Sequence, residues 1–367
     1  MLNEAKSAVA KSEGGAKQLL TGNEALVRGA LKAGATFLAG YPITPTTEIM
    51  KYWADEHLKN KNADNLVFLQ TEDEMAAGFA TIGACLAGIK AFTTTAGPGN
   101  ILMQDAFAMA ENLRLPIVSF IMQRGGPSTG TVIYSQQELN LTCFGGNGEG
   151  LRIVYSTANI QELYDYAIKS FNTAWKYRFP TFLLGDGYQS KEFSTVEQKE
   201  PQEIIEPSPY LLNPNKEAGT YANLRNTYNL EEELAEVIAS HKKSFDEIAP
   251  EVIEFEDIHT LDAELVIFSH GIVSTVAKEA QEDLRKEGLK VGLFRPITLS
   301  PFPTQSAQQV VSGKSILIVE SSLGQFARLL KSQISMDFSK VKELFKPAMG
   351  VAKQEIIEEV KKIIKKK

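Results

Sequence analysis

The residues best suited to chemistry lie in four short segments, and each segment follows a run that predicts a buried strand. These segments are GYPITPTT (40–47), QTEDEM (70–75), TTTAGPGN (93–100) and QRGGPSTG (123–130). In open parallel sheets, ligands bind beyond the carboxyl ends of the strands. The sequence therefore predicts that the four segments meet at one edge of a sheet and form one site.

Three consecutive acids, Glu72, Asp73 and Glu74, stand at the start of a predicted helix, where negative charge suits the helix dipole. The rest of this helix is apolar and rich in alanine and glycine. A carboxylate in its first turn would be partly desolvated, which would raise its pKa toward a value useful for proton transfer. A capping role and a catalytic role both remain open for these acids.

Thr44 and Arg124 each allow a structural and a functional interpretation. Thr44 before Pro45 fits a helix N-cap followed by a proline in the first helical position, but its hydroxyl could instead contact a ligand. Arg124 lies in a glycine-rich loop, where its guanidinium could bind a carboxylate; a surface salt bridge is the default for any single arginine. Asn100 is expected to cap the helix that follows it. The Gly/Pro loops are weak evidence alone, because they match neither GxGxxG nor a P-loop.

A GDG segment, Gly185 to Gly187, together with Asn213 and Asn215, imitates the GDG…N pattern that binds Mg²⁺ and the diphosphate of thiamine diphosphate. The residues that follow it argue against this function, since they predict no helix, form a charged proline-rich connector and contain no Asn-Asn pair. We interpret the segment as the end of the last strand of the first domain.

Composition excludes several classes of protein. The 367 residues carry a net charge of −7, which disfavours non-specific binding to nucleic acid. No apolar run reaches the roughly 18 residues of a membrane span, so we expect a cytoplasmic protein without a membrane partner. A cubane iron–sulfur cluster takes about four thiolates. The chain has only Cys85, in a predicted helix, and Cys143, in a predicted loop, and both are expected to be inert.

The histidines give no sign of a metal site. Four are scattered along the chain without metal-ligand spacing, so no metal is expected on this chain: His57, His241, His259 and His270. His270 follows a predicted strand in FSHG and is expected in a loop or at an interface.

Alternating strand-like and helix-like runs between residues 22 and 186 predict a doubly wound α/β domain. The alternation stops in an acidic, proline-rich stretch and resumes after a polar helix. We therefore divide the chain into a loose leader (1–20), a first α/β domain (21–195), a linker with a polar helix (196–255), a smaller α/β domain (256–345) and a C-terminal helix with a basic tail (346–367).

Six segments together resemble one family in the same order along roughly residues 20 to 345. They are TGNEALVRGALKAGATFLAGYPITPTTEI, QTEDEMAAGFATIGA, TTTAGPGN, QRGGPSTG, VGLFRPITLSPFP and VVSGKSILIVESSLGQFARLL. The chain thereby resembles the alpha subunit of 2-oxoacid:ferredoxin oxidoreductases, which act on 2-oxoglutarate, pyruvate or branched-chain 2-oxoacids. The resemblance implies a thiamine-diphosphate-binding-type doubly wound parallel sheet, the pyrimidine-side domain, and a transketolase C-terminal-like α/β domain.

The resemblance also implies partner chains. A beta subunit would supply the GDG motif that binds Mg²⁺ and the diphosphate, and beta or other subunits, including gamma- and delta-type chains, would hold the [4Fe-4S] clusters. Thiamine diphosphate would lie between alpha and beta. Ferredoxin, coenzyme A and a 2-oxoacid would be the other partners. Small-residue helices such as 82–88 would pack between subunits.

Carried over by position, three residues would serve catalysis. Glu74 matches the glutamate that hydrogen-bonds the aminopyrimidine ring and favours its imino tautomer. Thr44 matches the threonine near substrate and cofactor, and Arg124 is the candidate for the substrate carboxylate. The implied cofactor-binding set is Tyr41, Pro42, Ile43, Thr44, Glu74, Gly97, Pro98 and Gly99. The implied substrate loop holds Arg124, Gly125, Gly126, Ser128 and Thr129.

The segment after RGGPSTG departs from the family. Typical 2-oxoglutarate members continue with LPT…QGDL…HGD, whereas this chain reads TVIYSQQELNLTCFGGNGEG. We expect oxidation of 2-oxoglutarate with coenzyme A to acyl-CoA and CO₂, a reaction that could also run in reverse. Pyruvate, branched-chain and aromatic 2-oxoacids remain open as substrates.

Two rival functions are weighed beside this one. The first is a self-contained thiamine-dependent lyase or transferase that uses residues 185–215 as its own diphosphate site. The second is a regulatory scaffold that kept the fold and lost the chemistry.

Overall fold

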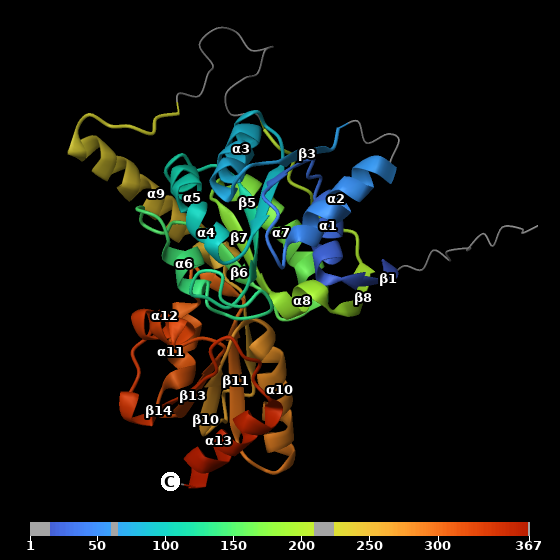
Figure 1. Ribbon diagram of the computed structural model, residues 1–367. Helices are drawn as coiled ribbons and strands as arrows, with labels where there is room; N and C mark the ends of the chain where they lie inside the picture. The colour runs from blue at the N-terminus through green and yellow to red at the C-terminus, as the bar shows by residue number, and fades with distance from the viewer. Residues whose placement is uncertain (1–14, 60–64, 209–223, 366–367) are drawn as a thin grey trace, which may run out of the picture.

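The computed structural model describes residues 15–59, 65–208 and 224–365, and they form two α/β domains stacked one above the other in Figure 1. The larger domain is built on a seven-stranded sheet of order β12-β6-β7-β5-β4-β2-β3, parallel except for β12. Its strands are β2 (Phe37–Gly40), β3 (Val67–Gln70), β4 (Ala91–Thr95), β5 (Val118–Gln123), β6 (Ile153–Ser156), β7 (Thr181–Asp186) and β12 (Thr298–Ser300).

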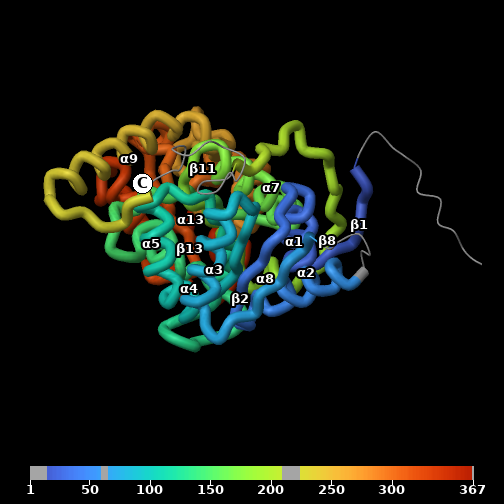
Figure 2. Tube along the Cα trace, turned by 90° about the horizontal axis from the view of Figure 1, so that it is seen from above, coloured from blue at the N-terminus to red at the C-terminus, as the bar shows by residue number. Residues whose placement is uncertain are grey.

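Helices cover both faces of this sheet, so every residue of β4, β5, β6 and β7 is buried. Successive strand residues point to opposite faces. Phe120 and Leu183 pack toward one layer of helices, and Ile121 and Leu184 pack toward the other. Figures 1 and 2 show these two helix layers on either side of the strands.

The helices of this domain begin mostly at the carboxyl ends of strands. They are α1 (Gly22–Lys32), α2 (Thr47–Lys59), α3 (Glu74–Leu86), α4 (Pro98–Leu102), α5 (Gln104–Asn112), α6 (Leu139–Phe144), α7 (Ile160–Tyr177) and α8 (Gly187–Lys191). α7 shows how local sequence defines such an element. Asn159 caps its N-terminus by accepting from the Glu162 main-chain N–H, and its buried residues recur at helical spacing toward α1 and the sheet.

The smaller domain is a five-stranded sheet of order β14-β13-β10-β11-β9 in which only β9 runs antiparallel. Its strands are β9 (Phe255–Ile258), β10 (Leu265–Phe268), β11 (Val291–Pro296), β13 (Ser315–Glu320) and β14 (Val341–Phe345). α10 (Gly271–Lys286) and α13 (Lys353–Lys365) cover one face. α11 (Thr304–Val311) and α12 (Gln325–Gln333) cover the other, and a short 3-10 helix, η1 (Phe338–Lys340), precedes β14.

A small antiparallel sheet pairs β1 (Ala16–Thr21) with β8 (Phe193–Gln198). Residues 16–20, which the sequence analysis placed in a loose leader, are thus part of a strand, and residues 1–14 lie outside the described part. The polar helix expected in the linker is α9 (Glu231–Val252). None of the described helices is long and apolar enough to cross a membrane.

The two domains interlock where β12, which lies between β11 and β13 in sequence, pairs with β6 of the larger sheet. Gln136 of the larger domain donates from Nε2 to the His270 carbonyl (2.8 Å) and accepts at Oε1 from the Ser321 N–H (2.9 Å). His270 is buried at the start of α10, where its Nδ1 lies 3.0 Å from Ser156 Oγ and burial lowers its pKa to about 3. His270 is therefore a neutral residue of the domain interface.

Candidate active site

The four segments singled out from the sequence do meet at one edge. They follow β2, β3, β4 and β5, which are neighbours in the order β5-β4-β2-β3 and are all parallel. The carboxyl ends of these strands therefore lie side by side, and we call the residues there the strand-end site: Tyr41 to Thr44, Glu74, Gly97 to Asn100, and Arg124 to Gly130.

The three consecutive acids at the start of α3 differ in burial and in hydrogen bonding. Asp73 is the N-cap, since its Oδ1 accepts from the Ala76 N–H at 2.7 Å, and Glu72 is exposed. Glu74 is the first helical residue and is only 5% exposed. Burial raises the pKa of Glu74, and the negative charge of Asp73 adds to this, whereas a hydrogen bond from its own main chain and the charge of Arg124 lower it. Glu74 is thus the desolvated carboxyl group that the sequence predicted.

Two glycines of TTTAGPGN leave the space that this carboxyl group and Arg124 occupy. A Cβ at Gly99 would lie 2.6 Å from Glu74 Oε1 and 2.2 Å from Thr95 Oγ1. A Cβ at Gly97, where φ is 54°, would lie 2.7 Å from Arg124 Nε. The loop is therefore shaped around two side chains of neighbouring segments, and it is more than a turn.

The interpretation of Thr44 as a helix cap is wrong. α2 begins at Thr47, three residues later, and the Thr46 hydroxyl bonds the Ile43 carbonyl at 2.9 Å within the turn. The Thr44–Pro45 peptide bond is cis, and the side chain of Thr44 is exposed. Its main-chain carbonyl accepts from Arg124 Nη1 at 2.8 Å, so the structure joins these two predicted residues directly.

Arg124 is not the surface residue that a single arginine is by default. It is 5% exposed, and its Nε is buried without a hydrogen-bond partner among the described residues. Its charge lowers the pKa of two carboxyl groups, Glu74 and Glu138. A buried guanidinium whose only side-chain bond among the described residues goes to a main-chain carbonyl can bind an anionic ligand.

The predicted substrate loop is buried at its start and exposed at its tip. Gly125 is buried beside Ala348 of the smaller domain, since a Cβ at Gly125 would lie 2.9 Å from the Ala348 Cβ. Ser128 and Thr129 are exposed beyond the cis Gly126–Pro127 bond. The smaller domain therefore packs against the base of this loop, and the tip lies open.

Sequence reasoning missed Glu138, which is 4% exposed in the segment that departs from the family pattern. Its Oε1 accepts from the main-chain N–H groups of Gly97 (2.8 Å) and Arg124 (3.0 Å), and its Oε2 accepts from Asn100 Nδ2 (3.0 Å). Burial raises its pKa, while these donors lower it. Asn100 is therefore not the expected cap but a residue within α4 that faces Glu138. A lone acid among the neighbours Gln136, Gln137 and Leu139 was the available signal.

The GDG segment has no room for a metal or a diphosphate. Asp186 is 3% exposed, and its Oδ1 accepts from the N–H groups of Tyr188 (2.9 Å) and Gln189 (3.1 Å). A Cβ at Gly187 would lie 1.4 Å from the Ile133 carbonyl oxygen. The segment ends β7 as expected, but a helix does follow, since Asp186 caps α8. Asn213 and Asn215 lie outside the described residues.

The cysteines lie in apolar surroundings. Cys85 and Cys143 are both free and fully buried, and burial raises the pKa of each thiol to about 12. Such thiols are poor nucleophiles and poor metal ligands at neutral pH. Cys143 lies in α6 rather than in the predicted loop.

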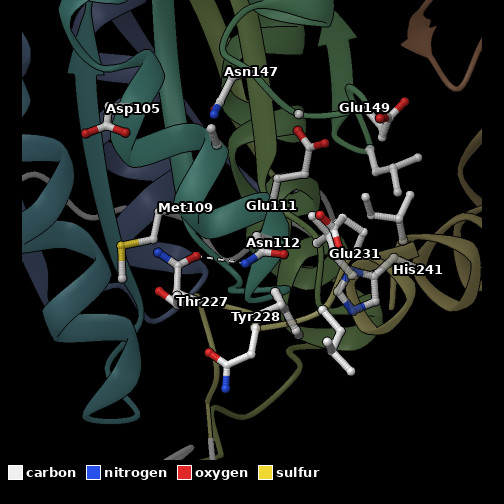
Figure 3. A pocket seen from close by; sticks show the side chains of 18 residues that line it. Asp105, Met109, Glu111, Asn112, Asn147, Glu149, Thr227, Tyr228, Glu231 and His241 are labelled. Carbon is white, nitrogen blue, oxygen red and sulfur yellow. Dashed lines mark hydrogen bonds between the residues drawn. The ribbon is translucent and has the colours of Figure 1, made fainter. Parts of the chain in front are cut away.

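A separate cavity of about 550 Å³ lies between α5, residues 147–149 and the start of α9 (Figure 3). Its lining includes the acids Asp105, Glu111, Glu149 and Glu231. None of the residues of the strand-end site lines it. The exposed apolar side chains of Met75, Ile101 and Leu102 adjoin residues of the strand-end site in the chain.

The fold places the chain in a structural class. A doubly wound sheet with a buried glutamate at its strand ends, joined to a second α/β domain, has a transketolase-like fold. A split-gene transketolase in an inactive β4 tetramer covers 94% of this chain with a TM-score of 0.54 at 12% identity, a likeness of fold alone.

Sequence models then identify the family. Residues 28–263 match the thiamine diphosphate-binding domain of pyruvate flavodoxin/ferredoxin oxidoreductase, and residues 263–363 match core domain II of pyruvate:ferredoxin oxidoreductase. The chain belongs to the 2-oxoacid:ferredoxin oxidoreductase family, as an alpha subunit of the enzyme.

Three relatives illustrate this membership. The 2-oxoglutarate synthase subunit KorA of Methanocaldococcus jannaschii is 34% identical, over 84% of this chain and 89% of its own length. The ketoisovalerate oxidoreductase subunit VorB of Methanothermobacter marburgensis is 33% identical, over 86% and 89%. The structure of 2-oxoglutarate:ferredoxin oxidoreductase from Magnetococcus marinus, with 2-oxoglutarate, coenzyme A and succinyl-CoA bound, has a TM-score of 0.84 at 25% identity and covers 99% of this chain and 68% of that one.

Proposed function

We propose that this chain supplies the pyrimidine side of a thiamine diphosphate site in a 2-oxoacid:ferredoxin oxidoreductase that converts 2-oxoglutarate and coenzyme A to an acyl-CoA and CO₂. The observation that carries the proposal is the buried carboxyl group of Glu74 beside Gly99, with Arg124 next to it. The relatives named for 2-oxoglutarate support the choice of substrate.

The residues of the strand-end site fit the aminopyrimidine end of the cofactor. Glu74 is desolvated and has a raised pKa, so its carboxyl group can share a proton with a ring nitrogen. The Thr95 hydroxyl is fully buried and has no hydrogen-bond partner among the described residues, which leaves a polar group for a ligand. When bound, thiamine diphosphate supplies the electron sink for decarboxylation.

This chain's own residues would then bind and orient the substrate. The Arg124 guanidinium would bind the carboxylate next to the 2-oxo group, and its bond to the Thr44 carbonyl fixes the direction of the side chain. The exposed Thr44 hydroxyl lies on the same turn and would contact the reacting atoms. Tyr41, Pro42, Ile43, Gly97 and Pro98 would form the wall beside the ring.

Partner chains complete the proposal. The buried Asp186 leaves no diphosphate or Mg²⁺ site in GDG, and the two buried cysteines cannot hold a cluster. We therefore assign Mg²⁺ and the [4Fe-4S] clusters to a beta subunit, with gamma- and delta-type chains beside it. Exposed apolar side chains that adjoin the strand-end site in the chain fit such an interface. Ferredoxin would accept the electrons in the cytoplasm.

Ketoisovalerate is the second candidate substrate, because a relative named for it is 33% identical, whereas relatives named for 2-oxoglutarate are 34% and 30% identical. The loop after Arg124 departs from the 2-oxoglutarate pattern and exposes the aliphatic side chains of Val132 and Ile133.

The test is to purify the tagged chain anaerobically from its host at low salt and to identify the accompanying chains by mass spectrometry. We expect a chain with a GDG motif and cluster cysteines, and dye reduction that depends on a 2-oxoacid. The ratio of kcat/KM for 2-oxoglutarate and ketoisovalerate then decides the substrate. A lone colourless chain that holds thiamine diphosphate and Mg²⁺ by itself would overturn the proposal.

A further inference from the structure

Glu138 connects two of the loops that form the strand-end site. One oxygen, Oε1, accepts from the main-chain N–H of Gly97 and from that of Arg124, at 2.8 and 3.0 Å. The other oxygen accepts from Asn100 Nδ2 at 3.0 Å. A single carboxyl group, on the residue just before α6, thus ties the end of β4 to the end of the neighbouring strand β5.

This tie decides where the Arg124 side chain lies. Arg124 crosses directly over Gly97, where a Cβ would be only 2.7 Å from its Nε, before it reaches the Thr44 carbonyl. If the N–H groups of Gly97 and Arg124 moved apart, the Arg124 side chain would no longer lie across Gly97, and its guanidinium would not reach the Thr44 carbonyl. The place of Arg124 therefore depends on both main-chain bonds to Glu138.

Glu138 is itself held in place by the sheet. Its main-chain N–H donates to Gln123 Oε1 at 3.2 Å, and Gln123 Nε2 donates to the Gly185 carbonyl at 3.2 Å. The Thr142 hydroxyl donates to the Glu138 carbonyl at 2.8 Å. Glu138 thus connects the two loops to the centre of the sheet at β5 and β7.

A buried acid is a costly way to fill space. Glu138 is 4% exposed, and no ion pair to it occurs among the described residues, so three N–H donors and the charge of Arg124 offset its desolvation. An apolar side chain of similar volume would fill the same space without that cost, but it could not accept these bonds.

We infer that Glu138 is a positioning residue for the 2-oxoacid: it fixes the main chain of Gly97 and Arg124 so that the Arg124 guanidinium is held ready for the substrate carboxylate. The inference rests on the proposed function and extends it to a residue outside the strand-end site. It predicts that loss of the acceptor affects substrate binding more than it affects folding.

The experiment compares three variants in the purified complex. Glu138→Met keeps the volume and removes the acceptors. Glu138→Gln keeps one oxygen that can accept both main-chain bonds and loses only the acceptor for Asn100 Nδ2. Glu111→Gln is the matched control, because Glu111 is also buried (5% exposed) and loses its ion pair with Arg152, and among the described residues its carboxyl group bonds to Arg152 rather than to the strand-end site. For each complex we would measure KM and kcat for the 2-oxoacid, Tm, and amide hydrogen exchange in peptides that cover 93–100 and 123–130.

For Glu138→Met we expect KM to rise about tenfold or more, with a smaller change in kcat, and faster exchange in both peptides. Glu138→Gln should keep KM within about threefold of wild type, because the shared acceptor remains. Glu111→Gln should lower Tm without a change in KM or in the exchange of these peptides.

Two results would overturn the inference. One is a Glu138→Met complex whose KM and exchange match those of Glu111→Gln; the other is a Glu138→Gln complex with a tenfold rise in KM, which decides the matter if Glu138→Met does not assemble. A wild-type complex that reduces dye with no 2-oxoacid would instead overturn the proposed function and the inference with it.

Discussion

The segment around Glu74 and the GDG segment around Asp186 both place a buried carboxyl group at the start of a helix, but their surroundings differ. Asp186 accepts two main-chain N–H bonds, and the next residue, Gly187, lies against the Ile133 carbonyl, so this space is filled. Near Glu74, Thr95 Oγ1 and Arg124 Nε are buried without partners among the described residues.

The difference teaches how to separate a binding site from a structural imitation of one. Both carboxyl groups have raised pKa values because of burial, so a raised pKa alone does not separate them. Buried polar groups without partners do not separate them either, because the Tyr134 hydroxyl near Asp186 is one of these as well. The bonds of the two carboxyl groups do separate them, since among the described residues Asp186 accepts from two other residues and Glu74 accepts only from its own main chain. We therefore expect the GDG motif, which looks more specific in sequence, to be the structural one of the two.

The largest effect is expected from Glu74→Gln in the assembled complex. Loss of the proton-sharing carboxyl group should lower kcat by about 10²- to 10⁴-fold, the usual contribution of general acid–base catalysis. Glu72→Gln, two residues away and exposed, is the control and should keep the wild-type rate. Turnover of Glu74→Gln at close to the wild-type rate would remove the distinction between the two segments.

Arg124→Lys should raise KM for the 2-oxoacid by about ten- to a hundredfold, because an ammonium group cannot bind the Thr44 carbonyl and a carboxylate in the planar geometry of a guanidinium. Steady-state kinetics with saturating coenzyme A would measure it. Arg285→Lys, at the partly exposed ion pair with Asp262 in the smaller domain, should leave KM unchanged. An equal change in both variants would show that Arg124 has no special role.

Asp186→Asn should change stability with pH and leave cofactor binding intact. Burial raises the pKa of Asp186 to about 7 from its ordinary 3.8, so the folded state binds this proton more tightly than the unfolded state. The Asp186 contribution therefore destabilises the wild-type protein progressively as pH rises from about 4 to about 7, and stays constant above that.

The asparagine variant lacks this titration and keeps an oxygen for both capping bonds. At pH 4 the variant and the wild-type protein should have nearly the same free energy of unfolding. At pH 8 the free energy of unfolding of the variant should be larger, by the order of 1–4 kcal/mol. Thermal unfolding at the two pH values would show it. A loss of thiamine diphosphate or Mg²⁺ from the complex would mean that Asp186 belongs to a site after all.

The smallest effect concerns the thiols. Because burial raises the pKa of Cys85 and Cys143 to about 12, iodoacetamide at pH 8 should label neither in the folded complex and both in denaturant. Mass spectrometry of the intact chain would count the labels. Rapid labelling of one cysteine in the folded complex would show that its surroundings open.

Local sequence predicted a large part of the fold. Apolar runs such as VSFIMQ marked strands buried on both faces, and the alternation of strands and helices marked both domains. The pairing of β12 with β6 was not predictable, because a three-residue strand carries little periodicity and its partner lies far away in sequence.

Within the site, the sequence by itself determined that four loops follow parallel strands and that Glu74 begins an apolar helix, since both follow from residue order and helix chemistry. Only the tertiary structure decided that Thr44 is not a helix cap and that Arg124 bonds the Thr44 carbonyl. It also decided that Glu138 joins the loops after β4 and β5. Such contacts join residues that are distant in the chain, and the close approach of β2, β4 and β5 creates them. Local patterns encode elements, and the arrangement of those elements selects which side chains meet.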